Sequence, residues 1–91
     1  MGAGFKLEII TPLKAWPARD VVSLVAPGDE GPFTVLARHE PLVALLKAGP
    51  LRIGLEDGTG ELWTVSGGVL TVEQDRVIVL AERASPDTRS S

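Results

Sequence analysis

Apolar residues alternate with polar ones in short segments along most of this chain, and Gly and Pro separate the segments. The segment Phe5-Lys6-Leu7-Glu8-Ile9 shows the pattern most clearly. Because successive side chains of a β-strand point to opposite faces, this alternation predicts a half-buried strand. Such segments recur about every ten residues with no long amphipathic helical pattern between them, so the sequence predicts an all-β sandwich or small barrel.

Turn-forming residues divide the rest of the chain into further predicted strands. Pro17 makes the second strand short or places it at a sheet edge, because proline lacks the N–H that an interior strand must donate. The segment 42–46 fits a helical turn nearly as well as a strand. Strands are otherwise expected at 21–26, 33–36, 51–55, 61–66, 69–73 and 76–82, with an exposed loop at 27–32, turns at 57–60 and 74–75, and a bend at Gly67-Gly68.

The length of 91 residues allows one domain with one core. Aromatic residues make up only 4% of the chain and cysteine is absent, so Val and Leu have to fill the interior without help from disulfides. We expect this domain to span residues 1–84. The remaining residues, 85–91, are polar and lack apolar spacing, which predicts a disordered or frayed tail.

Charge and hydropathy exclude several classes of protein. The net charge is −3, and the basic residues are scattered, which argues against nucleic-acid binding. No uncharged stretch approaches the roughly twenty residues that cross a bilayer, so no direct membrane insertion is expected. The first residues lack the basic start and apolar middle of a signal peptide, which predicts a cytoplasmic product.

Candidate catalytic residues are few. His39 is the only histidine, and a metal site built around it would need carboxylates for most of its ligands. Ser23 and Ser66 lie in strand patterns rather than in a sharp strand-to-helix turn. Asp29-Glu30 and Glu56-Asp57 are adjacent acidic pairs on expected loops, where both carboxylates reach solvent. We therefore predict a protein that is not an enzyme and that has no cofactor and no metal site.

The loop at 27–32 is the one segment whose composition suggests docking. Pro27 and Pro32 stiffen it, while Gly28 and Gly31 allow its backbone to approach another surface closely. A rigid loop loses little conformational entropy when it binds a partner. An ordinary connection between two strands explains the same composition, and the residues alone leave both interpretations open.

Three blocks in register resemble the N-terminal domain of the ATP synthase epsilon subunit family. They are Lys6-Leu7-Glu8-Ile9-Ile10-Thr11-Pro12, the segment from Val22 to Phe33 that contains Pro27-Gly28-Asp29-Glu30-Gly31-Pro32, and Ser66-Gly67-Gly68-Val69-Leu70-Thr71-Val72. Between and after them, His39-Glu40-Pro41-Leu42, Lys47-Ala48-Gly49-Pro50-Leu51-Arg52-Ile53 and Val77-Ile78-Val79-Leu80-Ala81-Glu82 are similar to further family segments. The resemblance covers roughly residues 5–84.

The resemblance implies a flattened ten-stranded β-sandwich at the foot of the central stalk, or rotor, of an F-type ATP synthase. There the domain would pack on the gamma subunit and rest on the c-subunit ring, coupling the two during proton- or sodium-driven ATP synthesis. It implies a non-catalytic, peripheral protein on the cytoplasmic face of the bacterial inner membrane.

Matching residue by residue, the resemblance assigns functions to two sets of positions. The c-ring contact would be made by Gly28, Asp29, Glu30, Gly31, Pro32 and His39, and the gamma contact by Thr11, Leu42 and Val43. This chain has Ala37-Arg38 and Glu40 where the family has a Pro-Gly turn and an alanine, which implies a changed loop next to His39.

Many family members continue into a C-terminal helical hairpin that inhibits ATP hydrolysis and sometimes binds ATP. Residues 85–91 are too few to form it, so we expect neither inhibitory helices nor a nucleotide site. Two alternatives remain from the residues. One is a small all-β carrier of the lipoyl or biotinyl type, although Lys6, Lys14 and Lys47 lack the Asp-Lys or Met-Lys dyad of such carriers. The other is a ligand-binding barrel, although the strands supply mainly Val, Leu and Ile.

Overall fold

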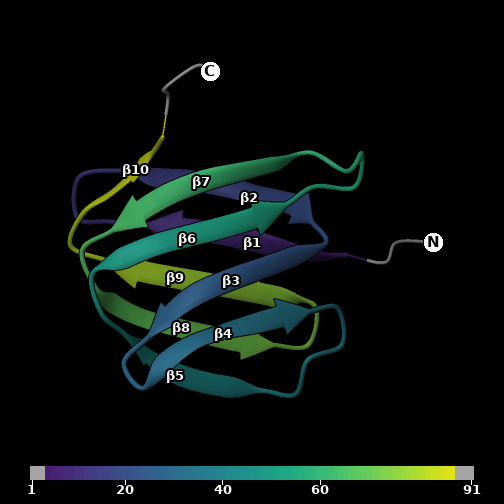
Figure 1. The fold of residues 1–91 in the computed structure, drawn as a ribbon, viewed down its shortest axis with the longest axis horizontal. Coiled ribbons are helices and arrows are strands. Elements are labelled where there is room, and N and C mark those ends of the chain that lie inside the picture. The colour runs from purple at the N-terminus through teal and green to yellow at the C-terminus, as the bar shows by residue number, and fades with distance from the viewer. Residues whose placement is uncertain (1–3, 88–91) are drawn as a thin grey trace.

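The computed structural model describes residues 4–87, and every regular element in this part of the chain is a β-strand (Figure 1). The strands follow one another at short intervals, as the alternation in the sequence predicts. They are β1 (Phe5–Ile10), β2 (Ala15–Val21), β3 (Ser23–Gly28), β4 (Gly31–Leu36), β5 (Leu42–Leu46), β6 (Gly49–Gly54), β7 (Gly60–Val65), β8 (Gly68–Glu73), β9 (Arg76–Ala81) and β10 (Ala84–Pro86).

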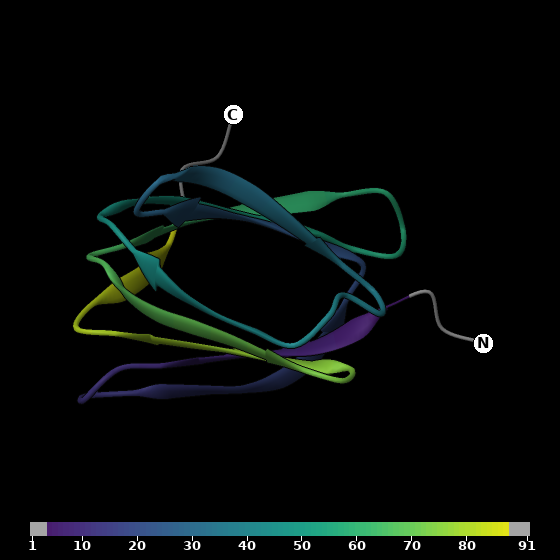
Figure 2. The same ribbon diagram turned by 90° about the horizontal axis from the view of Figure 1, so that it is seen from below.

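The strands form one hydrogen-bonded sheet that doubles back on itself. Its order is β10-β7-β6-β3-β5-β8-β9-β1-β2, and β4 pairs with β3. Between β3 and β5 the pairing is reduced to Gly28 with Leu46, and there the sheet folds over. Figure 2 shows the resulting two layers, one formed by β4, β3, β6, β7 and β10 and the other by β5, β8, β9, β1 and β2. The predicted flattened ten-stranded β-sandwich is confirmed.

Aliphatic side chains fill the space between the layers, because each strand turns every second residue inward. The most deeply buried ones come from both layers, and none of the buried residues in the described part of the chain is polar. Those with the largest volumes are Leu7, Leu24, Leu51, Ile53, Leu70, Val21, Val35, Val65, Val77 and Val79. The described interior is thus a packed aliphatic core, as the composition predicts.

The segment 42–46, which the sequence leaves open between helix and strand, is the strand β5. The expected strand at 21–26 is divided, because Val21 ends β2 and Ser23 begins β3. The expected loop at 27–32 is wrong in extent. Pro27 and Gly28 belong to β3, and Gly31 and Pro32 belong to β4, so only Asp29 and Glu30 remain in the turn.

Proline positions agree with the sheet topology. Pro17 lies in β2, which ends the strand order and so forms an edge, as predicted. The β1–β2 register shifts between Leu7 and Ile9, opposite this part of β2. An edge strand tolerates proline because one side of its backbone faces no neighbour.

The end of the described chain differs from the predicted tail. Ser85 and Pro86 pair with Thr64 and Trp63 of β7, and the Asp87 N–H donates to the Leu62 oxygen at 2.7 Å. Residues 85–87 therefore belong to the sheet, and the boundary after residue 84 is corrected. The rest of the predicted tail, residues 88–91, lies outside the described residues.

Candidate docking surfaces

The β3–β4 hairpin carries an exposed acidic turn, Asp29 and Glu30. Two backbone hydrogen bonds attach the end of this hairpin to β5 and to Lys47, the residue that follows it. The Asp29 N–H donates to the Leu45 oxygen at 2.9 Å, and the Lys47 N–H donates to the Pro27 oxygen at 2.9 Å. The two carboxylates are therefore presented by a short turn whose backbone is anchored to the other layer.

Glycine is required at the base of this turn. A Cβ on Gly28 would lie 2.6 Å from the Gly31 oxygen and 2.8 Å from Cδ1 of Phe33, both closer than van der Waals contact allows. Gly28 is buried, Gly31 is half-buried, and Pro32 is exposed at the start of β4. The structure thus brings the predicted c-ring residues 28–32 together at one end of the sandwich.

His39 lies apart from the acidic turn. It follows β4, which lies between it and Glu30. At about 3.3 Å per residue, β4 spans roughly 16 Å from Gly31 to Leu36. Nδ1 of His39 lies 2.8 Å from the backbone oxygen of Glu40. The backbone N–H of His39 donates to the Leu36 oxygen at 3.2 Å. The predicted c-ring set is therefore divided between the two ends of β4.

An apolar surface covers the outward side of the layer that begins with β5. The strand registers place Leu45 beside Val69, Val69 beside Leu80, and Leu80 beside Ile10. The exposed fractions are 63% for Leu45 and 45% for Leu80. We call this surface the outer apolar face, and its apolar members are Ile10, Val43, Leu45, Val69, Ile78 and Leu80. The same registers place Thr71 between Val43 and Ile78, and Glu8 beside Ile78.

The three residues predicted for the gamma contact differ in their relation to this face. Val43 belongs to it and is 72% exposed. Thr11 follows Ile10 at one end of it, and its hydroxyl donates to the Lys14 oxygen at 3.1 Å. Leu42 points the other way, since it alternates with Val43 and packs against the core. Leu45 and Leu80 are the residues that the sequence analysis missed, and the i, i+2 spacing of Val43 and Leu45 would have indicated one of them.

The acidic turn and the outer apolar face meet at β5. An open groove of about 460 Å³ lies between them, with residues 28–33 on one side and Val43, Ala44 and Leu45 on the other. Leu45 contributes its side chain to the face and its oxygen to the bond that holds Asp29. A partner could therefore contact an apolar area and two carboxylates at once.

The opposite side of the sandwich is closed by an ion pair between the layers. Nη1 and Nη2 of Arg19 donate to Glu61, at 2.9 Å to Oε1 and 2.7 Å to Oε2. The Trp63 Nε1–H also donates to Oε1, at 3.1 Å. The hydrogen bond with Arg19 lowers the pKa of Glu61, and burial opposes this shift. The Trp16 and Trp63 rings meet edge to face at 5.0 Å. This cluster is a structural closure of the sandwich.

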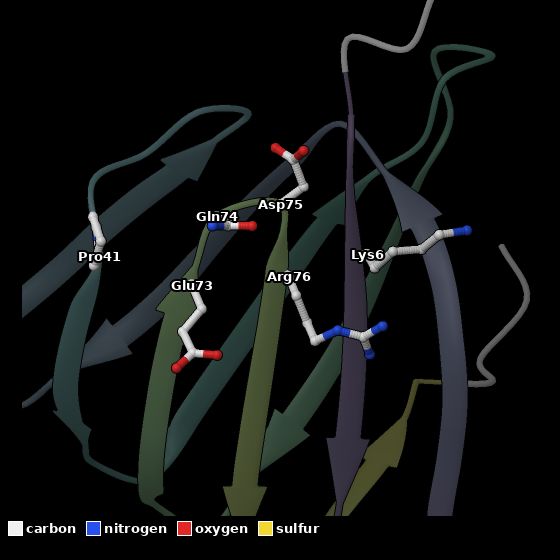
Figure 3. Close-up of a pocket in the computed structure, with 6 residues that line it drawn as sticks. All are labelled: Lys6, Pro41, Glu73, Gln74, Asp75 and Arg76. Atoms are coloured by element: carbon white, nitrogen blue, oxygen red, sulfur yellow. The ribbon is translucent and has the colours of Figure 1, made fainter.

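Figure 3 shows a hollow beside the β8–β9 turn with several charged residues around it. Their side chains do not converge. Lys6 Nζ pairs with Asp20 at 2.9 Å, and Arg76 Nη1 pairs with Glu8 at 2.7 Å, so both cations are held by neighbouring strands. The hollow therefore lacks the convergent acid, base or nucleophile of a catalytic site.

Metal binding and membrane spanning find no support in the described residues. His, Asp and Glu side chains within residues 4–87 form no group of three or more that could hold a metal ion. Within the same range there is no helix of sufficient length and hydropathy to cross a membrane.

Comparison with known proteins agrees with this architecture. Residues 4–87 match the family model described as the beta-sandwich domain of the ATP synthase delta/epsilon chain. The ATP synthase epsilon chain of Chlorobium limicola is 38% identical over 81 residues, which are 89% of this chain and 92% of that one. The epsilon chain of Dichelobacter nodosus is 38% identical over 85 residues, which are 93% of this chain but 59% of that one.

A solved structure extends the agreement to three dimensions. A chain in the mitochondrial ATP synthase of Euglena gracilis, an assembly of OSCP, F1 and c-ring, superposes with a TM-score of 0.88 at 26% identity. The match covers 94% of this chain and 55% of that one. The family model spans nearly all of the sequence, and the relatives exceed a third identity across most of it. The chain therefore belongs to the delta/epsilon-chain β-sandwich family of ATP synthases.

Proposed function

We propose that this protein is a non-catalytic subunit of the ATP synthase central stalk that couples the gamma subunit to the c-subunit ring. It would act on the cytoplasmic face of the bacterial inner membrane as a peripheral component. Membership in the epsilon-chain family supports this function. The similar chain in the Euglena gracilis mitochondrial ATP synthase, whose structure contains F1 and the c-ring, supports a position next to the c-ring.

The observation that carries the proposal is the outer apolar face. Val43, Leu45 and Leu80 remain exposed although the core between the layers is complete without them. Contiguous apolar residues on the outside of a small domain mark a contact with another protein. We assign this face to the gamma subunit, with Thr11 at its edge, while Leu42 supports β5 from the core side.

The acidic turn suits the c-ring contact. Asp29 and Glu30 are exposed at the end of an anchored hairpin, where they can pair with basic groups on a ring of polar loops. Such pairs at the rim of an interface contribute about 0–1 kcal/mol each, so they orient the domain more than they hold it. His39, which follows the other end of β4, would reach the ring only if the ring surface follows that strand.

Co-purification tests the assignment. A tagged chain recovered from native membranes should bring the gamma and c subunits with it. The double variant Val43→Lys with Leu45→Lys should lose more than tenfold of this recovery, because each apolar side chain contributes about 1.5–3 kcal/mol when it is buried. Thr64→Lys, which adds a charge to an exposed position on β7, serves as the control. Recovery without gamma, or equal recovery of all variants, would contradict the proposal.

The carrier alternative receives no support from the comparisons. Among the lysines that the sequence offers for attachment, Lys14 lies nearest to a hairpin turn, between β1 and β2. Its Nζ lies over the Trp16 ring, 4.9 Å from the centroid, in a cation–π contact. The intact mass of the protein from native cells tests the carrier hypothesis, because a covalently attached cofactor would add to the mass and would support that hypothesis.

A further inference from the structure

Two edges of the sandwich are protected against pairing with another chain. The edge strand β2 contains Pro17, Arg19 and Asp20, and its register with β1 is interrupted. The edge strand β10 is three residues long and ends at Pro86. Proline, charge, irregular register and short length are the features by which natural proteins keep exposed strand edges from pairing.

The edge strand β4 shares one of these features, Pro32, but lacks the others. Its sequence, Gly31-Pro32-Phe33-Thr34-Val35-Leu36, contains no charged residue. Within residues 4–87, β4 pairs only with β3, so its other side has no neighbouring strand. Thr34 is exposed, and Leu36 is 55% exposed. An uncharged six-residue edge of this kind is a template for another strand.

The two prolines of the hairpin determine which backbone groups of β4 are available. Pro27 lies directly opposite Pro32, and neither has an N–H, so they cannot form a hydrogen-bonded pair. Hydrogen-bonded and non-hydrogen-bonded pairs alternate along an antiparallel ladder. The pairs of Thr34 with Val25 and of Leu36 with Ser23 are therefore also non-hydrogen-bonded. The N–H and C=O groups of Thr34 and Leu36 point away from β3.

Two of the outward groups are already accounted for. Pro32 offers an oxygen but no N–H, and the Leu36 oxygen accepts the His39 N–H at 3.2 Å. The outer edge of β4 thus presents the Pro32 oxygen, both groups of Thr34, and the Leu36 N–H.

We propose that this edge binds a second copy of the same chain, with the two β4 strands antiparallel and a two-fold axis at Thr34. Each Thr34 N–H then donates to the Thr34 oxygen of the second copy, and each Leu36 N–H donates to the Pro32 oxygen of the second copy. In this register the Leu36 oxygen lies opposite Pro32 of the second copy, which has no N–H to donate. The Leu36 oxygen needs no donor there, because it already accepts the His39 N–H. The array is therefore complementary to itself in this register.

Charge complementarity supports the same occupant. The acidic turn lies before β4, and Arg38, with φ 67°, lies after it. The antiparallel register centred on Thr34 brings the end of β4 that carries the acidic turn to the end of the second copy's β4 that carries Arg38. A parallel arrangement would instead set like charges beside each other, which is unfavourable.

The dimer would be weak and would cover the acidic turn. An edge contact of one strand is smaller than the roughly 1,000 Å² expected of a stable interface, so association should appear only at high concentration. Pairing would hold Asp29 and Glu30 against the second copy. Binding to the c-ring and self-association would then be mutually exclusive, and this consequence alone rests on the proposed function.

Sedimentation equilibrium tests self-association. The unmodified chain should associate at concentrations on the order of 0.1–1 mM in low salt. Thr34→Lys places one lysine from each copy next to the two-fold axis. Repulsion between these two charges should weaken association at least tenfold. Thr64→Lys, with the same charge on β7, should leave it unchanged. A monomer at roughly 1 mM, or equal effects of the two lysines, would overturn the proposal.

Cross-linking tests the register independently of variant stability. The chain has no cysteine, so Thr34→Cys introduces the only thiol. Directly opposed residues of a hydrogen-bonded pair have Cα atoms about 5.5 Å apart, which a disulfide can bridge. Oxidation should yield covalent dimer from Thr34→Cys, and little from Thr64→Cys. Arg38→Glu should weaken association, and adding Glu30→Arg should restore it. Equal cross-linking of both thiols would exclude this register.

Discussion

Gly68 shows how one residue can decide a local path of the chain. Its φ is +151°, and a Cβ at this position would lie 1.9 Å from the Leu80 oxygen. The backbone of β8 therefore approaches β9 more closely than any other residue permits. Gly67, with φ +109°, precedes it at the turn from β7. The glycine pair that the sequence marks as a bend is thus a requirement of close backbone contact.

Gly68→Ala should lower the free energy of unfolding by more than about 2 kcal/mol, because both the positive φ and the contact with β9 oppose a side chain. Urea unfolding followed by tryptophan fluorescence measures the change. Gly58→Ala is the matched control, since Gly58 also has a positive φ, +90°, but has open space around it. It should cost about 1 kcal/mol. Equal losses for the two variants would contradict the steric explanation.

The Arg19–Glu61 pair should make part of the stability depend on pH. The hydrogen bond from Arg19 lowers the pKa of Glu61 in the folded protein below its ordinary value. A lowered folded pKa stabilises the protein above the unfolded pKa, and this contribution is lost as the pH falls through the folded pKa. Since both side chains are more than a third exposed, we expect at most about 1 kcal/mol at neutral pH.

Comparison of Glu61→Gln with the unmodified chain isolates this contribution. The urea midpoint of the variant should be lower at pH 7, and the difference should shrink below about pH 4. Glu56→Gln, on the exposed β6–β7 turn, should show no such difference. A gap between the Glu61 variant and the unmodified chain that is constant from pH 7 to pH 3 would indicate packing rather than ionisation.

At the scale of single elements, β5 is the strand that most needed the structure. Its five residues, Leu42-Val43-Ala44-Leu45-Leu46, are all apolar, so no polar residue marks an outward face. The structure alternates them, with Val43 and Leu45 outside and Leu46 only 6% exposed. These two outward apolar side chains form part of the outer apolar face.

Adjacent substitutions should distinguish the two sides of β5. Leu46→Lys should destabilise the fold by more than about 3 kcal/mol, because it buries an unpaired charge in the core. Leu45→Lys should change stability by no more than about 0.5 kcal/mol. Thermal unfolding of both variants provides the measurement. A similar loss for both would mean that β5 does not alternate as the structure has it.

The fold could be predicted from the sequence where alternation and turn residues act together. The hairpin at Asp57–Gly60 is an example, since Gly58 has a positive φ and Asp57 Oδ1 accepts the Thr59 N–H at 2.9 Å. β10 could not be predicted, because its three residues have no alternation and depend on pairing with β7. The extent of the 27–32 loop was wrong for a related reason. Proline and glycine suggest a loop locally, yet β3 and β4 pair through them.

The docking residues stay predictions, and the structure adds how they lie relative to one another. Residues 28–32 lie together because they adjoin one turn. The family resemblance grouped His39 with them from the neighbouring loop, and β4 lies between that loop and the acidic turn. Leu80 was missed because its outward orientation depends on the pairing of β9 with β8 and β1. Such surface neighbours arise from strands distant in sequence.

At the scale of the whole molecule, the two layers present different surfaces to their surroundings. One layer ends in the acidic turn, and the other carries the outer apolar face, with β5 next to both. The aliphatic core holds the two layers together from inside, and the Arg19–Glu61 pair joins them at one edge. In the proposed stalk, force applied to one contact would pass through a packed body to the other.

Asp29→Ala combined with Glu30→Ala should weaken coupling while leaving the isolated fold intact. Loss of two rim charges should reduce ATP synthesis in membrane vesicles by a few-fold, consistent with about 0–1 kcal/mol per pair. The difference should diminish as ionic strength rises, because exposed charges are screened. Circular dichroism of the isolated variant is the control. If that variant unfolds, the two carboxylates have a structural function instead.

The parallel pairing of β1 with β9 joins Lys6 to Arg76 across most of the chain. Strand β1 therefore has no parallel neighbour until residues 76–80 have been synthesised. Non-local pairing of this kind slows folding, because a long segment must be ordered before the contact forms. The sandwich can thus close only after β9 has been synthesised, and any contact that needs both layers has to follow that step.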